Sequence, residues 1–168
     1  MGIREKGLEL IKSKNYKEAG KVLDQCLKQD SKDHLCWYYR GIVSLRARNY
    51  HYALECFEKA LSLRGRFEYY KLKGITYLEM LEFENAIHEF NRALNFKEES
   101  EVYFYIGVCH VFLDDHNAKI YMKKAYEKNK KRFKLMLKDF YDAVLKDSWE
   151  LTKHQKDSLV LFIDSISA

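Results

Sequence analysis

The stretch WYYRGIVSLRARNYHYALECFEKA, residues 37–60, decides the fold of this chain. It has Gly41 near its start, followed by Ala53, Phe57 and Ala60 at i, i+4 and i+7 spacing. This spacing places the last three side chains on one face of a helix. We expect two antiparallel helices that approach closely at the small residues, with the phenylalanine filling the space beside them.

The same pattern returns along the chain with a period in the low thirties. Glycines recur at steps of 34, 33 and 33 residues, and alanines at steps of 34, 33 and 32. The two series are Gly7, Gly41, Gly74 and Gly107, and Ala19, Ala53, Ala86 and Ala118. A large residue follows each alanine four positions later: Leu23, Phe57, Phe90 and Met122. Such a period, without strand signals, predicts stacked helical hairpins.

Composition excludes several other classes of protein. The chain has 168 residues, 47% of them hydrophobic, which is too many for a disordered tail. It has no proline, and no apolar run is long enough to span a membrane. The first residues lack the apolar core of a secretion signal. The four cysteines show neither CxxC spacing nor a disulfide-rich density, so we expect buried, reduced thiols in a cytoplasmic protein.

Two segments carry the resemblance to a known family. Residues 37–60 and residues 70–93 resemble the tetratricopeptide repeat, with an aromatic residue, a glycine four positions later, and the alanine series. The first copy is similar but lacks the leading aromatic residue, and the fourth is one residue short at Asp114-Asp115. The proline near the end of each family repeat is absent. The resemblance implies an all-α, right-handed superhelical solenoid of four hairpins, at about 1–33, 34–66, 67–99 and 100–131.

The remaining segment, 132–168, lacks the glycine–alanine pattern. Its first part, 132–146, places apolar residues on one helical stripe, and Thr152 with Gln155 is typical of the start of a last helix. Repeat arrays need ends that shield an exposed apolar face. We therefore predict a C-terminal helical cap, with two alternatives left open. These helices could instead occupy the groove of the array, or pair between chains through Leu159, Phe162, Ile163 and Ile166 to give a homodimer.

The resemblance also implies a concave groove, lined by the first helix of each hairpin, that binds a protein or peptide segment. The residues predicted to line it are Leu35, Tyr38, Tyr39, Ile42, Leu72, Ile75, Phe104, Tyr105 and Val108. The alternative is that most of them pack against neighbouring helices. A clamp for a C-terminal carboxylate, known in this family, is disfavoured because acids (Glu5, Glu9 and Glu68) stand at its positions.

Charge gathers in one segment. Residues 119–138 hold nine basic side chains against one acid, Glu127, a local charge of +8. The predicted basic patch comprises Lys119, Lys123, Lys124, Lys128, Lys130, Lys131, Arg132 and Lys134. Its simplest interpretation is a solvated junction; the alternative is contact with nucleic acid or an acidic partner.

Sequence features of catalysis are lacking. The six histidines are scattered, with no metal-ligand spacing, and there is no glycine-rich phosphate loop. Adjacent Cys109 and His110 point about 100° apart on a helix, so they do not form a nucleophile–base pair. We therefore predict no enzyme activity, metal or cofactor. The predicted function is that of a non-catalytic adaptor, with a nucleic-acid-contacting regulator and a homodimeric scaffold as alternatives.

Overall fold

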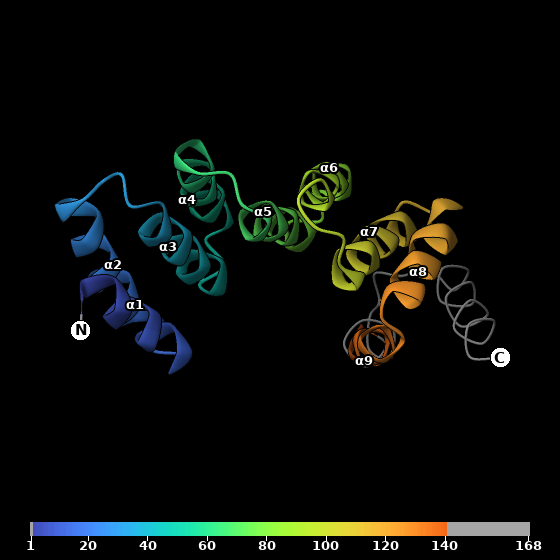
Figure 1. The fold of residues 1–168 in the computed structure, drawn as a ribbon, viewed down its shortest axis with the longest axis horizontal. Helices are drawn as coiled ribbons and strands as arrows, with labels where there is room; N and C mark the ends of the chain where they lie inside the picture. The colour runs from blue at the N-terminus through green and yellow to red at the C-terminus, as the bar shows by residue number, and fades with distance from the viewer. Residues whose placement is uncertain (1, 141–168) are drawn as a thin grey trace. The chain divides into compact units, whose positions relative to one another are not determined.

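A computed structural model describes residues 2–140, and within them every regular element is a helix (Figure 1). The helices are α1 (Ile3–Lys12), α2 (Tyr16–Gln29), α3 (His34–Arg46), α4 (Tyr50–Leu63), α5 (Phe67–Glu79), α6 (Phe83–Leu94), α7 (Ser100–Phe112), α8 (Asn117–Lys128) and α9 (Lys130–Phe140). The predicted all-α repeat fold is confirmed. Of the predicted cap, α9 is described; Thr152, Gln155 and the proposed dimer helix lie outside the described residues.

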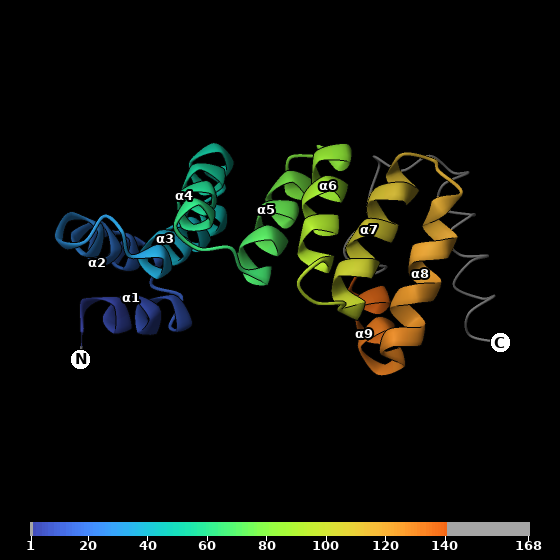
Figure 2. The ribbon, with the colours of Figure 1, turned by 45° about the horizontal axis from the view of Figure 1, so that its top comes forward.

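The chain divides into two compact units, residues 1–82 and 83–168. In the first unit α1 packs against α2 and α3 against α4, and the two hairpins meet where α2 contacts α3 (Figures 1 and 2). Helix α5 packs against α4. In the second unit α7 packs against both α6 and α8, and α9 contacts α7 and α8.

The hairpin turns share one backbone motif. Lys14, Arg48, Leu81 and Asp114 each have a positive φ, between 53° and 61°. After each of them an N–H group reaches back five residues, as in the 2.8 Å bond from Asn15 N to Leu10 O and the 2.9 Å bond from Asn49 N to Ser44 O. This is the Schellman ending of a helix, in which the left-handed residue satisfies the last carbonyl groups.

Side-chain caps fix the starts of α2 and α3. The side chain of Asn15 accepts a hydrogen bond from the Glu18 N–H group, which begins α2 after the predicted turn. The carboxylate of Asp33 accepts from the N–H groups of Leu35 and Cys36, at 2.9 and 3.1 Å, and begins α3. Such caps satisfy N–H groups that have no partner inside the helix.

The glycine series marks the closest approach between paired helices. A Cβ atom placed on Gly41 would lie 2.5 Å from the Phe57 ring, and one on Gly7 would lie 2.8 Å from Leu23. At Gly107 the nearest atom would belong to Met122, at 2.9 Å. These are the glycine–large-residue pairs that the spacing predicts. Because glycine has no side chain, each large residue can fill the space between the two paired helices. We call these three glycine–large-residue contacts the glycine seam.

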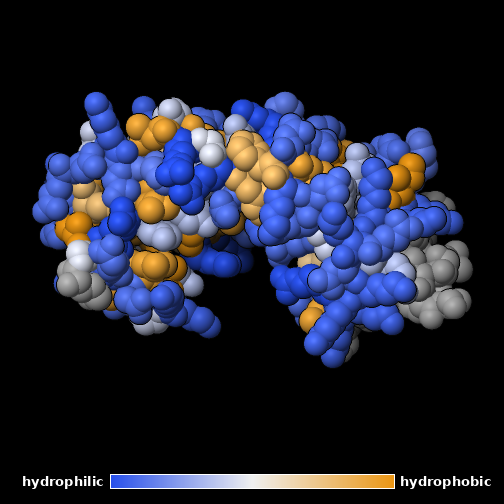
Figure 3. All heavy atoms as spheres, in the orientation of Figure 1, coloured by the Kyte–Doolittle hydropathy of each residue, from blue (hydrophilic) through white to orange (hydrophobic). Residues whose placement is uncertain are grey.

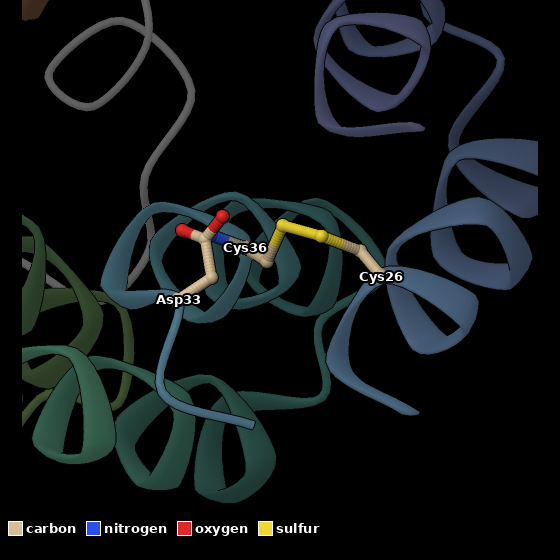
Figure 4. A group of neighbouring side chains, drawn as sticks. All are labelled: Cys26, Asp33 and Cys36. Carbon is tan, nitrogen blue, oxygen red and sulfur yellow. A yellow bond between two sulfur atoms is a disulfide. The ribbon is translucent and has the colours of Figure 1, made fainter. Parts of the chain in front are cut away.

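The cysteine prediction is wrong for one pair. Cys26 and Cys36 form a disulfide between α2 and α3, with their Cα atoms 6.4 Å apart (Figure 4). Cys56 and Cys109 are free and buried. The pair was missed because a spacing of ten residues matches no motif. It is brought together by the folding of the linker 30–33, which returns the chain from the end of α2 to the start of α3.

The seam predicts a large effect for one small substitution. Gly41→Ala places a methyl group against the buried Phe57 ring, and we expect a loss of about 1–3 kcal/mol in the free energy of unfolding. Gly20→Ala is the matched control, because its Cβ atom would meet Val43 at an ordinary 3.7 Å. Helix propensity favours that change by up to about 1 kcal/mol. Urea denaturation measures the free energy of unfolding of both variants. Equal values would contradict the close packing of Phe57 against Gly41.

Candidate protein-interaction surfaces

The first helices of the first unit form a continuous layer. Helix α1 contacts α3, and α3 contacts α5. Six of the predicted groove residues belong to this layer and are all partly exposed: Leu35, Tyr38, Tyr39, Ile42, Leu72 and Ile75. We call these six residues the tyrosine surface. Figure 3 shows hydrophobic residues reaching the surface of this unit on the face in view.

The tyrosines of this surface are held by other aromatic rings. The ring centroid of Tyr38 lies 4.8 Å from that of Tyr69, 5.3 Å from Tyr39 and 6.3 Å from Phe57. Burial, with a smaller contribution from the Glu68 carboxylate, raises the pKa of Tyr38 to about 12. Its hydroxyl group is therefore protonated at neutral pH and can both donate and accept a hydrogen bond.

Tyr69 is fixed in turn by a histidine. The hydroxyl group of Tyr69 and Nδ1 of His34 share a hydrogen bond, and their rings lie 5.9 Å apart. Burial raises the pKa of Tyr69 to about 12, and burial together with Arg66 and Arg64 lowers the pKa of His34. The pair is thus neutral at pH 7, and its hydrogen bond restrains the Tyr69 ring against which Tyr38 packs.

The same residues also pack into the core. Tyr39 contacts the buried cluster that contains Leu23 and Cys36. Tyr38, Ile42, Leu72 and Ile75 contact the cluster of Leu45, Ala53 and Phe57. Each of these five side chains therefore has one buried side, whose contacts restrict its rotamer, and one exposed side.

The predicted groove residues of the second unit differ. Phe104 and Val108 are each only 3% exposed, so the expectation that they line an open groove is corrected. The ring of Phe104 meets those of Phe133 and Phe140 on α9, at 5.8 and 6.1 Å. Helix α9 comes from beyond the repeats, and the periodicity does not reveal which helix it covers. Tyr105 is partly exposed and stacks on Phe90 at 5.5 Å.

The basic patch lies on α8 and α9, and all eight of its side chains are exposed. Acids outside the patch neutralise part of it. Lys128 pairs with Glu98 at 2.8 Å, and Arg132 pairs with Glu101 at 3.0 Å. Sequence spacing missed these partners because they lie about thirty residues away. Figure 3 shows a mostly hydrophilic face where α8 and α9 lie.

Aromatic rings beside the patch are already covered by cations. Lys124 Nζ lies 5.2 Å from the ring centroid of Tyr121 and 5.8 Å from that of Tyr103, and Lys130 Nζ lies 5.3 Å from Tyr126. Within residues 2–140, Lys119, Lys131 and Lys134 form no ion pair. These three cations are thus the part of the patch most available to a partner.

The part of the chain that the structure describes holds few groups with metal-binding or nucleophilic chemistry. The one metal-like group found there is Cys26, Asp33 and Cys36, whose sulfur atoms are joined to each other (Figure 4). Burial raises the pKa of the Cys109 thiol to about 12, so it is not a thiolate at neutral pH. Asp115 accepts the N–H group of Asn117 at the start of α8, as a turn residue does. Among the described helices, none combines the length and apolar character needed to cross a bilayer.

Comparisons with known proteins agree with this architecture. Sequence models of the tetratricopeptide repeat match residues 5–33 and 34–66. The TPR repeat-containing protein MJ1428 of Methanocaldococcus jannaschii is 27% identical over 138 residues, which are 82% of this chain and 23% of that protein. The chain thus spans about a quarter of the length of this relative.

Solved structures share the fold at low sequence identity. MamA superposes with a TM-score of 0.73 at 17% identity, covering 96% of this chain and 92% of MamA. YrrB, described as a TPR protein with an unusual peptide-binding site, gives 0.71 at 20%, covering 98% and 84%. PilW, a type IV pilus biogenesis factor, gives 0.74 at 19%, covering 98% and 76%. Residues 5–66 thus match the tetratricopeptide repeat, and the chain shares its repeat fold with these solved structures.

Proposed function

We propose that this chain is a non-catalytic protein-interaction module whose tyrosine surface binds an apolar or amphipathic segment of a partner protein. The observation that carries this proposal is the set of six partly exposed apolar and aromatic residues on the adjoining helices α3 and α5. Tetratricopeptide-repeat proteins are in general interaction modules, and YrrB is described as binding peptide. Both points support the class of function; the residues come from this chain.

Preorganisation makes this surface suitable for recognition. Tyr38 lies among the rings of Tyr39, Phe57 and Tyr69, so its side chain loses little conformational freedom when a partner covers it. Tyrosine also offers a rigid apolar ring with a hydroxyl group at its tip. A partner segment would gain affinity by removing water from these rings around one apolar anchor.

Acidic side chains near the tyrosine surface disfavour a partner that would bind through its C-terminal carboxylate. Glu68 lies close enough to Tyr38 to raise the pKa of its hydroxyl group. Glu5 and Glu9 on α1 are exposed and already pair with Arg4 and Lys12. A free C-terminal carboxylate would be repelled by Glu68, whereas a lysine or arginine of the partner would be attracted. The proposed ligand is therefore an internal segment with an apolar anchor and a basic residue that would lie beside Glu68, away from Arg64 and Arg66.

The test uses peptides selected from a random display library for binding to the intact chain. We expect Tyr39→Ala to weaken the selected peptides about tenfold or more, because an aromatic anchor contact is lost. Tyr52→Ala is the matched control: Tyr52 is also partly exposed but lies on α4, where Arg40 stacks over its ring at 4.8 Å. Titration calorimetry measures affinity, and circular dichroism confirms that both variants fold. Equal affinity of both variants would place the site elsewhere.

We propose as a second function that the basic patch contacts an acidic partner protein. The observation that favours it is the set of exposed cations on α8 and α9 that have no acidic partner within residues 2–140. On α9 the basic Lys131 and Lys134 lie opposite the buried Phe133, Met136 and Leu137. The rings near the patch are covered by Lys124 and Lys130, which disfavours a stacking platform for single-stranded nucleic acid.

Charge reversal tests the second function. We expect Lys131→Glu with Lys134→Glu to weaken binding of polyglutamate about tenfold at low salt, because two attractive charges become repulsive. Lys17→Glu with Lys28→Glu, two exposed positions on α2, is the control of equal charge change. Fluorescence anisotropy at several salt concentrations measures the effect. Tighter binding of duplex DNA than of polyglutamate would favour nucleic acid as the partner. If neither ligand binds, the basic patch is not a binding site for anionic partners.

A further inference from the structure

The junction between α2 and α3 differs from the equivalent junctions of the other repeats. By the period of the chain, Cys26 corresponds to Ala60 and Ala93, and Cys36 corresponds to Tyr69 and Val102. All six residues are buried, at 4% exposure or less. Where the later repeats bury an alanine and a larger apolar side chain, the first junction holds two small residues joined by a covalent bond (Figure 4).

Noncovalent contacts also hold this junction, because Leu23 of α2 and Val43 of α3 share one buried cluster and Arg40 of α3 pairs with Asp24 of α2 at 2.6 Å. A cysteine at position 36 buries less apolar surface than a tyrosine or a valine, and burial is the main source of packing free energy. In α1 the one buried residue is Gly7. A polar link joins Arg4 of α1 to Asp33 at 3.1 Å, but the arginine side chain is 40% exposed, so the pair contributes little. The disulfide adds to these contacts a covalent restraint between α2 and α3 that the other junctions lack.

The third member of the cluster has another role. Asp33 lies with the two sulfur atoms in a group whose ligand atoms are all within 4.8 Å of one another. Its Oδ1 accepts from the N–H groups of Leu35 and Cys36, and its Oδ2 pairs with Arg4. Both oxygen atoms are engaged in capping and pairing, so this cluster favours sulfur redox chemistry over metal binding.

We propose that Cys26 and Cys36 form a redox-modification site that controls how firmly the α1–α2 hairpin is held on the rest of the first unit. A dithiol reductant delivers two electrons and two protons: the S–S bond breaks, two thiols form, and the reductant becomes a disulfide. Because both sulfur atoms are buried, exchange proceeds through opening of the junction between α2 and α3. This inference does not depend on the proposed binding functions.

Amide hydrogen exchange of the intact chain tests the proposal, with and without dithiothreitol. In the oxidised protein we expect residues 3–29 to be protected, and on reduction their exchange accelerates on the order of thirtyfold. Residues 50–63 of α4 serve as the internal reference and keep their rates. The double variant Cys26→Ala with Cys36→Val reproduces the pair found at Ala93 and Val102, and its exchange is expected to be insensitive to dithiothreitol.

A thiol count completes the experiment. Denatured protein that has not been reduced should show two reactive thiols, from Cys56 and Cys109, and reduced protein should show four. In the folded protein burial raises the pKa of Cys56 to about 11 and that of Cys109 to about 12, so these thiols do not compete in the exchange. Four thiols without reductant, or equal exchange of residues 3–29 in both redox states of the wild-type chain, would overturn the proposal.

Discussion

The close contact between a glycine and a large side chain is the constraint on which three of the helical hairpins depend. Leu23, Phe57 and Met122 are fully buried, and each occupies the space that a Cβ atom on Gly7, Gly41 or Gly107 would need. A helix pair joined in this way has one favourable register, because sliding by a residue would bring a side chain against the large residue. In the first unit the same register brings α1, α3 and α5 into contact and so creates the tyrosine surface.

The turns show where this chain does without glycine. The left-handed residues Lys14, Arg48, Leu81 and Asp114 recur at steps of 34, 33 and 33, in the rhythm of the seam. A left-handed conformation costs a non-glycine residue roughly 1 kcal/mol, and glycine is usual there. The chain instead has glycines at helix contacts, where a Cβ atom at Gly7, Gly41 or Gly107 would lie within 3 Å of a large side chain. Two Schellman hydrogen bonds at each turn offset the strain, and the seam holds both helices in position.

Sequence predicts the parts of the fold that depend on local spacing. The pairing of Gly41 with Phe57 follows from the period, and the cap at Asn15 follows from residue type. Two features were missed because they depend on tertiary placement. The contact of Phe104 with α9 joins a repeat helix to a helix without the repeat pattern, so no periodicity reports it. The disulfide depends on the path of the linker 30–33, which a count of cysteines does not contain.

The candidate binding residues were only partly predictable for a related reason. An apolar residue on a repeat helix can face a neighbouring helix, a partner or both, and Tyr38 does both: it packs among Tyr69 and Phe57 and keeps an exposed side. The contacts that hold its ring also lower the entropic cost of binding a partner. Stability and recognition therefore share this residue, and its truncation would affect both. Tyr39 packs on a different core cluster from Tyr38. A variant at Tyr39 therefore separates the loss of binding from the loss of stability more clearly than one at Tyr38, when the folding of the variant is measured independently.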